Sequence, residues 1–394
     1  MRIAIASQNF VQANNGQAVF ARNLAKRLAD GGHEVLCLTP SDRGEPYRVE
    51  EGQLQIAAIT SVALKPFYPD VRVSFWADRA VSKLLDEFHP DVVHIQDHFP
   101  LCRAVVRKAR ARSIPLLGTN HFLPENLVPY IPILGRIPAT RRLVERILWR
   151  QVRVVFSAMD AVAAPSRTAA CILEREAGIP SVVAISCGVD VEAWQADPSL
   201  EPSAARAVFG LPEEGVGVLY LGRVDREKRV DVLVRAVADL GCSEVWLAVA
   251  GTGSELAALK RLARRTDGSA RVYFLGFIAE PALPVLLRAA DVFAMPSEAE
   301  LLSIATLEAM AAGLPVLAAN ARALPELVEH GVNGYLFRPG DASDAAHWLR
   351  ALACDGALRR RMGEAGRQRA TAHALPQTVA AYEKMYQDVL ARRR

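Results

Sequence analysis

MPSEAELLSIATLEAMAAGLPVLAAN, residues 295–320, begins at the end of the apolar run 292–295 and contains a helical segment and a second apolar run. The helix can begin near Ser303, and the apolar run at residues 316–318 is expected to form a strand. A strand, a helix and a further strand in this order are typical of a parallel sheet covered by helices. The stretch therefore predicts one unit of a parallel α/β fold.

The same alternation of apolar runs and helical segments extends through the whole chain. Strands are expected at residues 3–6, 35–38, 92–95, 116–117, 161–164, 182–185, 218–221, 245–250, 272–275, 292–295 and 316–318. Between the first two, Phe20, Leu24 and Leu28 recur at the four-residue spacing of a helix that covers a sheet. A second helix with this spacing is expected from Trp76 to Phe88.

The length of the chain and one irregular segment indicate its domains. At about 150 residues per domain, 394 residues correspond to two large domains or three small ones. Residues 188–202 are polar, contain proline and lack periodicity, as linkers do. We therefore expect an N-terminal domain at residues 1–187, a hinge at 188–201 and a C-terminal domain at 202–375. Two such sheets with their carboxyl ends facing each other would form a ligand-binding cleft.

Composition excludes several classes of protein. Hydrophobic residues make up 51% and charged residues 23%, as in packed globular proteins rather than disordered or fibrous ones. The six cysteines show no C-x-x-C pair or metal-ligand spacing, which favours a reducing compartment. The first residues, MRIAIASQNF, do not build a signal-type apolar core, and no apolar run is long enough to span a bilayer. A cytoplasmic location is expected.

Two glutamates in the opening stretch are candidate ligand-binding residues. Glu300 and Glu308 are separated by seven residues, and a carboxylate can accept hydrogen bonds from two adjacent hydroxyls of a ribose or hexose. The early helical turn at Ser303 and Ile304 offers free N–H groups and a positive dipole to a phosphate. Alone, the glutamates could also be two solvated carboxylates at helix ends.

Cations and glycines follow the neighbouring strands. In LGRVDREKRVDVL, Arg223 and Lys228 come directly after a strand, and two fixed cations there could hold a diphosphate. In AGTGSEL, Gly251 and Gly253 allow close approach of the backbone to a ligand, and Phe277 ends the next motif, LGF. The alternative for the two cations is a set of surface ion pairs with the acidic residues between them.

These motifs, in this order and together with HGVNGYLF and PGD downstream, resemble retaining glycosyltransferase family 4, which has the GT-B fold. The resemblance covers nearly the whole chain and implies two Rossmann-like parallel-sheet domains that face each other across a cleft. It also implies that Arg223 and Lys228 hold the nucleotide diphosphate and that Glu308 binds the ribose. Glu300, with the N–H groups near Ser303, would then bind the donor sugar.

Three positions depart from the family pattern. Leu301-Leu302-Ser303 replaces the usual Gly-Phe-Gly, Arg229 replaces the glycine after the lysine, and Cys187 replaces a frequent asparagine. The preference for a particular sugar is therefore left open.

The first half of the chain carries weaker matches. Gly16, in the turn after the first strand, matches the family's glycine loop, and His121 matches a histidine placed near the 6-hydroxyl of the reacting sugar. The motif NHFLPENLVPYI is similar to the corresponding sequence of family members that glycosylate diacylglycerol or related lipids. An ordinary hydrogen-bonded histidine is the alternative for His121. In VHIQDH, His94, Asp97 and His98 are expected to be structural.

A basic segment lies between the two sets of motifs. From residue 101 to residue 153 there are eleven Lys and Arg against two Glu. Read as a helix, residues 143–155 place Leu143, Ile147 and Trp149 beside arginines, a combination that suits an anionic bilayer surface. A solvated face and a nucleic-acid patch are the alternatives, and nucleic acid is not expected as a partner. The arginines concerned are Arg136, Arg141, Arg142, Arg146, Arg150 and Arg153.

The expected function is transfer of a hexose from a UDP- or GDP-sugar to an acceptor hydroxyl with retention, on a membrane lipid such as diacylglycerol. The resemblance implies a front-face mechanism without a protein nucleophile, and neither a cofactor nor a metal is expected. The last helix, residues 376–394, is expected to pack back on the first domain as the family's last helix does. A peripheral position on the inner face of the cell membrane would follow from a lipid acceptor.

Other functions have less support in the sequence. A dehydrogenase is disfavoured because Leu256 occupies the third position of the glycine fingerprint, and no P-loop or D-x-D triplet occurs. A soluble transferase that extends polysaccharide or makes a small glycoside is the alternative within enzymes. A non-catalytic sugar- or lipid-binding protein on a GT-B scaffold is the alternative from another class.

Overall fold

The computed structural model describes residues 1–11, 15–64, 68–128, 138–195, 197, 199–241, 244–266 and 271–393. The chain forms two compact units. The N-terminal unit comprises Met1–Cys187 and Pro376–Arg394, and the C-terminal unit comprises Gly188–Leu375.

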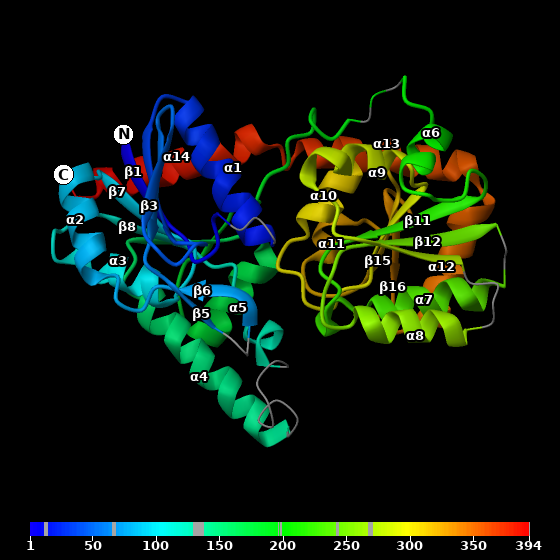
Figure 1. Ribbon diagram of the computed structural model, residues 1–394, viewed down its shortest axis with the longest axis horizontal. Coiled ribbons are helices and arrows are strands. Elements are labelled where there is room, and N and C mark those ends of the chain that lie inside the picture. Colours follow the sequence, from blue (N-terminus) through cyan, green and yellow to red (C-terminus); the bar gives the residue numbers. More distant parts are fainter. Residues whose placement is uncertain are drawn as a thin grey trace. The chain divides into compact units, whose positions relative to one another are not determined.

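The N-terminal unit is built on an eight-stranded sheet in the order β10-β9-β8-β7-β1-β2-β4-β3 (Figure 1). Neighbouring strands are parallel except β3, which is antiparallel to β4 at one edge. The strands β5 and β6 form a separate antiparallel hairpin. The bounds are β1 Arg2–Ala6, β2 Glu34–Pro40, β3 Tyr47–Glu51, β4 Leu54–Ile59, β5 Val62–Leu64, β6 Tyr68–Val73, β7 Val92–Ile95, β8 Leu116–Thr119, β9 Ala161–Ala164 and β10 Val183–Ala184.

Helices cover both faces of this sheet because apolar residues recur on one side of each helix. Phe20, Leu24 and Leu28 on α1 are buried as predicted. The prediction was wrong for Trp76, which precedes α2 and is 84% exposed. The helices are α1 Gly16–Asp30, α2 Asp78–Phe88, α3 Pro100–Arg110, the short 3-10 turn η1 Pro124–Asn126, α4 Pro138–Phe156, α5 Arg167–Ala177 and α14 Leu375–Ala391.

The last helix, α14, lies against the N-terminal unit. Its Tyr382 and Tyr386 are fully buried there, and Tyr382 contacts the ring of Phe20 on α1. At its end, Arg393 pairs with Asp160 at 2.8 Å. These contacts join the end of the chain to the first sheet.

The C-terminal unit contains a six-stranded, wholly parallel sheet in the order β13-β12-β11-β14-β15-β16. Its strands are β11 Val216–Leu221, β12 Val245–Ala250, β13 Arg271–Gly276, β14 Val292–Met295, β15 Val316–Ala319 and β16 Gly334–Phe337. Its helices and turns are α6 Pro202–Val208, η4 Arg226–Lys228, α7 Val230–Leu240, α8 Leu256–Arg265, η5 Glu280–Ala282, α9 Leu283–Arg288, α10 Ile304–Ala311, α11 Leu324–Leu327, α12 Ala342–Cys354 and α13 Gly356–Thr371.

Each strand expected from an apolar run is present, within two residues at either end. Within the described ranges, no helix is both long and apolar enough to cross a bilayer.

Candidate functional site

Two loops meet at the carboxyl end of the C-terminal sheet, after β11 and β12. Gly222 N–H donates to Ala250 C=O at 3.0 Å, and Val224 N–H donates to Thr252 C=O at 2.8 Å. Gly251 has φ +141°, and a Cβ there would overlap the Gly222 carbonyl; at Gly253 it would overlap the backbone of Val224. The two glycines are therefore required for the contact between the loops, which the sequence did not indicate.

Asp225 connects these loops to the first cation. Its carboxylate accepts hydrogen bonds from the N–H and the hydroxyl of Ser254, both at 2.9 Å, and also pairs with Arg223. The second guanidinium nitrogen of Arg223 donates to Glu227 at 2.9 Å. The ion pairs considered as an alternative are thus present. They are not surface pairs, however, because both carboxylates are buried.

Lys228 pairs with a carboxylate from a different motif. It is the last residue of η4, and its Nζ lies 2.6 Å from Oε1 of Glu300. The side chains are 17% and 10% exposed. The carbonyl of Glu300 in turn accepts from the N–H of Ala323 at 3.2 Å. The structure therefore brings together two of the predicted site residues that are far apart in the sequence.

The helix α10 begins where the sequence predicted. Ser303 caps it by accepting the N–H of Thr306 at 3.2 Å, and the carbonyl of Ser303 accepts the N–H of Leu307 at 3.1 Å. The N–H groups of Ile304 and Ala305 belong to the first turn and have no acceptor within the helix. This end of α10 therefore presents donors and a positive dipole to an anion.

Glu308 lies one turn further along α10 and is only 8% exposed. Burial, with a smaller contribution from the charge of Glu280, raises the pKa of the Glu308 carboxyl to about 8. A carboxyl in this state is uncharged at neutral pH unless donors such as hydroxyl groups stabilise the carboxylate.

Arg229 occupies the position where the family has glycine. Its φ is +51°, in the left-handed region that favours glycine. Its guanidinium pairs with Glu298 and lies 3.3 Å from Asp231. Glu298 was not singled out from the sequence. Its position two residues before Glu300 is the one feature of the sequence that could have indicated it.

Phe277 directly follows β13, and its ring is 69% exposed. The loop that carries it lies beside the first glycine of AGTG, since Gly251 N–H donates to Gly276 C=O at 2.7 Å. Phe277 thus lies at the carboxyl end of the sheet, and its role as a ligand contact stays a prediction.

In the N-terminal unit, Gly16 is the first residue of α1, and the preceding Asn15 caps the helix by accepting the N–H of Ala18 at 3.0 Å. Residues 12–14 of the same loop lie outside the described residues. Asp97 is buried and accepts hydrogen bonds from the N–H groups of Gln8 (2.6 Å) and Phe99 (3.0 Å) and from the side chain of Gln17 (3.0 Å). Asp97 therefore joins the loops after β1 and β7, which confirms its structural role.

His121 follows β8 and is held by Gln96, whose Oε1 lies 3.1 Å from its Nε2. Its ring lies 4.9 Å from that of Phe20 between centroids, and burial lowers the pKa of His121 to about 3. His94 is fully buried between hydroxyl groups, as expected of a structural histidine. The ring of His98 stacks on Phe99.

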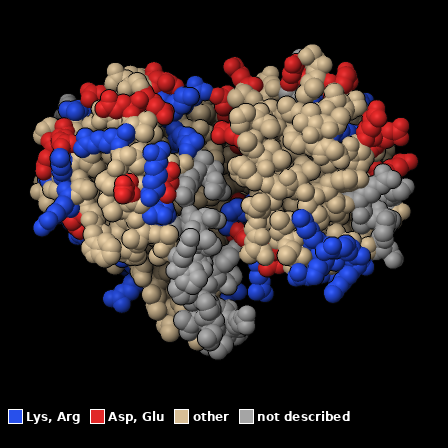
Figure 2. Space-filling view, in the orientation of Figure 1, with Lys and Arg blue, Asp and Glu red and all other residues tan. Residues whose placement is uncertain are grey.

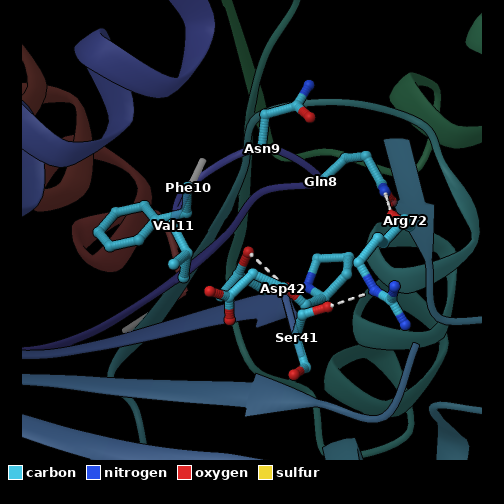
Figure 3. A pocket seen from close by; sticks show the side chains of 9 residues that line it. Gln8, Asn9, Phe10, Val11, Ser41, Asp42 and Arg72 are labelled. Carbon is cyan, nitrogen blue, oxygen red and sulfur yellow. Dashed lines mark hydrogen bonds between the residues drawn. The ribbon is translucent and has the colours of Figure 1, made fainter. Parts of the chain in front are cut away.

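A small hollow lies at the carboxyl ends of β1 and β2 (Figure 3). Gln8, Phe10, Ser41 and Arg72 are among its lining residues, and the guanidinium of Arg72 bonds to the carbonyl of Ser41 at 3.0 Å. Its volume of about 10 Å³ is room for about one water molecule. It is too small to hold a sugar or a lipid headgroup.

The basic segment forms α4, which extends beyond the rest of its unit (Figure 1). Leu143, Ile147 and Val154 are 53%, 48% and 68% exposed, but Trp149 is buried at 6%. The prediction that Trp149 belongs to the exposed face was therefore wrong, because its ring packs inside the unit. Arg136 lies outside the described residues, whereas Arg142, Arg146, Arg150 and Arg153 are exposed.

The two units differ in how charge is distributed on the face seen in Figure 2. Acidic and basic side chains are mixed over the N-terminal unit, whereas basic side chains gather over α8 of the C-terminal unit. Within the ranges that the structure describes, no three His, Cys, Asp or Glu side chains lie close enough together to hold a metal ion.

Comparison with known proteins identifies the family. The profile described as "Glycosyl transferases group 1" matches residues 203–369, and that described as "Glycosyltransferase Family 4" matches residues 14–193. The D-inositol 3-phosphate glycosyltransferase of Salinispora arenicola is 31% identical over 403 residues, which cover 95% of this chain and 88% of that protein. The chain belongs to family 4 of the glycosyltransferases, enzymes that use nucleotide-sugar donors.

Other relatives carry the names of different transferases and synthases. The sulfoquinovosyl transferase SQD2 of Arabidopsis thaliana is 28% identical over 88% of this chain, which spans 65% of that protein's length. The alpha-monoglucosyldiacylglycerol synthase of Streptococcus pneumoniae is 26% identical over 86% of this chain and 75% of that protein. Among solved structures, a sucrose-phosphate synthase of Thermosynechococcus elongatus has a TM-score of 0.81 at 23% identity, with 99% of each chain covered. This likeness confirms the GT-B fold.

Proposed function

We propose that the protein transfers a hexosyl group from a nucleoside-diphosphate sugar to a hydroxyl group of a membrane lipid such as diacylglycerol, with retention and without a metal ion. The observation that carries the proposal is the set of ion pairs at the carboxyl end of the C-terminal sheet. There, buried carboxylates hold Arg223 and Lys228 in fixed positions, next to the loop that leads into α10.

The chemistry that this arrangement can perform is stabilisation of a leaving diphosphate. Negative charge grows on the diphosphate as the bond to the anomeric carbon breaks, and fixed cations stabilise that charge without having to reorganise. The N–H groups of Ile304 and Ala305 would add to this effect, and Glu308 would accept hydrogen bonds from the ribose. The departing phosphate oxygen would take the proton of the acceptor hydroxyl, so no protein nucleophile is needed.

A lipid acceptor is supported by the surface of α4 and by the name of one relative, the alpha-monoglucosyldiacylglycerol synthase. Exposed Leu143, Ile147 and Val154 alternate with exposed arginines on this helix, so it can enter the interface of an anionic bilayer. Each arginine near such a surface contributes about 1 kcal/mol. A peripheral membrane position follows from this proposal.

A soluble acceptor is the second candidate, and the 31% identical relative named for D-inositol 3-phosphate favours it. A non-catalytic scaffold that only binds a sugar or a lipid is a third candidate. It is disfavoured because such a protein would not need a complete set of contacts to a leaving diphosphate. Incubation with UDP- or GDP-hexoses and a panel of lipid and sugar acceptors distinguishes all three. In the presence of EDTA, which removes metal ions, we expect a glycosylated diacylglycerol product. NMR of this product should show the same anomeric configuration as the donor sugar. Donor binding without turnover on any acceptor would contradict the proposal.

Flotation with anionic vesicles tests the role of α4 directly. The variant R142Q/R146Q/R150Q should lose binding at low salt, because it removes three charges from the proposed contact. R261Q/R264Q/R265Q removes three exposed charges from α8 and is the matched control. Equal loss in both variants would indicate attraction by net charge alone, and a wild type that does not float at low salt would favour the soluble acceptor.

A further inference from the structure

A chain of polar contacts runs through the buried centre of the N-terminal unit, from α14 to His121. Tyr386 on α14 bonds to Nδ1 of His94 at 2.8 Å, and Nε2 of His94 bonds to the hydroxyl of Thr119 at 2.8 Å. The side-chain amide of Gln96 lies next in the chain. Its Nε2 lies over the ring of His94, 3.2 Å from Nε2 and 3.5 Å from Nδ1, and its Oε1 is 3.1 Å from Nε2 of His121.

Gln96 is itself held firmly. It directly follows β7, is 0% exposed, and its N–H donates to the carbonyl of Ala6 at 2.9 Å. Its carbonyl accepts from the side chain of Gln17 at 3.2 Å. These two bonds hold the backbone of Gln96, and its side-chain amide places the nitrogen towards His94 and the oxygen towards His121.

The orientation of this amide decides which nitrogen of His121 carries the proton. An amide oxygen can only accept a hydrogen bond, so the proton must lie on Nε2 of His121, and Nδ1 keeps its lone pair. The ring of Phe20 packs against His121 and limits its rotation.

We propose that Gln96 is a positioning residue for His121: it holds the ring as the Nε2-protonated tautomer and leaves Nδ1 as the acceptor for a hydroxyl group of the substrate. The tyrosines of α14 support this arrangement through His94 and Thr119. This inference rests on the proposed function insofar as His121 contacts the sugar, whereas the tautomer itself does not depend on it.

The histidines and tyrosines of this network are uncharged near neutral pH, so the tautomer should persist there. Burial lowers the pKa values of His94 and His121 to about 3. Burial raises the pKa values of Cys37, Cys187, Tyr382 and Tyr386, which face the network from β2, α14 and the chain after β10. Two carboxyl groups also lie near its ends: Glu383 on α14 acts on Tyr386, and Asp97, whose pKa burial raises, is bonded to the Gln17 side chain that also bonds to Gln96.

The first experiment measures the tautomer in the wild-type protein by long-range ¹H–¹⁵N NMR of histidine rings labelled with ¹⁵N. The chain has eight histidines, and the His121 signals are those lost in His121→Asn. We expect an Nε2-protonated, Nδ1-unprotonated ring from about pH 5 to pH 8. An Nδ1-protonated ring would overturn the proposal whether or not the protein is a transferase.

The second experiment compares Gln96→Leu and Gln96→Glu with the same changes at the exposed Gln55. Gln96→Leu should give a mixture of tautomers and lower kcat about 10- to 100-fold with little change in KM, the range seen when a partner that orients a ring is removed. Gln96→Glu should preserve the tautomer but raise the pKa of His121. The loss of kcat on lowering the pH should therefore begin at a higher pH than in the wild type. An unchanged tautomer and kcat in Gln96→Leu would overturn the proposal.

Failure of each proposal can be recognised separately. If no sugar transfer is found with any acceptor but the Nε2-protonated ring is observed and lost in Gln96→Leu, the proposed function fails and the positioning by Gln96 stands. If transfer is found but the ring is protonated on Nδ1, only the inference about Gln96 fails. Should both Gln96 variants fail to fold, the wild-type spectrum alone decides the tautomer.

Discussion

Lys228 Nζ lies 2.6 Å from Glu300 Oε1, although the two residues are 72 positions apart in the sequence. The pair joins the loop after β11 to the loop after β14 at the carboxyl end of one sheet. Because both side chains are largely buried, each would be an uncompensated charge without the other. The pair therefore serves the stability of the unit as well as the position of the cation.

Replacing Lys228 should affect stability and activity in separable ways. Lys228→Met should lower the free energy of unfolding by about 3 kcal/mol, because it leaves Glu300 buried and charged. It should also raise the activation barrier for sugar transfer by roughly 2 to 4 kcal/mol. The double variant K228M/E300Q should regain most of the stability, measured by urea unfolding, but not the activity. If it regained full turnover, the cation would have no role in catalysis.

The strands that the sequence predicted best are those covered on both faces. In β12 all six residues, VWLAVA, are buried, so the strand is a continuous apolar run. The antiparallel edge strand β3, YRVEE, is mostly exposed and has no such run, and it was therefore missed. Trp76 fitted a helical spacing but lies before α2, because periodicity locates the ends of a helix poorly.

Sequence motifs named the residues of the site but not their partners. The family pattern singled out Lys228, Glu300 and His121, whereas the pairing of Lys228 with Glu300 depends on how two loops meet in three dimensions. Gln96 had no signal of its own, since a buried glutamine between two histidines looks like any polar residue at a strand end. Which residues of two strands or loops lie side by side depends on the tertiary structure, so it cannot be read from the spacing of residues along the sequence.

The buried carboxyl of Glu308 should make stability fall as pH rises. Its pKa is about 8 in the folded protein against the usual 4.5, so between these values the folded state holds one more proton than the unfolded state. Its contribution to stability is thus present below about pH 4.5 and is lost through about pH 8, by up to about 1.4 kcal/mol per pH unit. Urea unfolding at several pH values should show this decline relative to Glu308→Gln. Glu201→Gln, at an exposed position, should retain it.

Nucleotide binding should release a proton from the same group. Ribose hydroxyls that donate to Glu308 stabilise its charged form and lower its pKa, so UDP or GDP should bind more tightly as pH rises towards 8. Calorimetry near neutral pH in buffers of different ionisation enthalpy measures the released proton. Glu308→Gln should bind with no release. Equal proton release by this variant would show that another group is responsible.

Gly253→Ala should disturb the contact between the loops after β11 and β12. The added Cβ would overlap the backbone of Val224, so we expect a loss of stability of about 1 to 3 kcal/mol and weaker nucleotide binding. Gly356→Ala is the matched control, because its Cβ would meet only flexible arginine side chains at 3.6 and 3.7 Å. Fluorescence-monitored unfolding and nucleotide titration would measure both effects. Equal behaviour of the two variants would mean that the loops can move apart at no cost.

Arg229 provides a test of backbone strain at the position where the family has glycine. Arg229→Ala and Arg229→Gly both lose the pairs with Glu298 and Asp231, but only glycine relaxes the left-handed backbone at φ +51°. Arg229→Gly should therefore be more stable than Arg229→Ala by about 1 kcal/mol in urea unfolding. At the exposed helical position Arg261 the order should reverse, with alanine more stable than glycine by about 1 kcal/mol. Because the same two substitutions give opposite orders at the two sites, a general effect of glycine or alanine cannot produce the result. If alanine were also the more stable residue at position 229, the left-handed conformation would not be what favours glycine there.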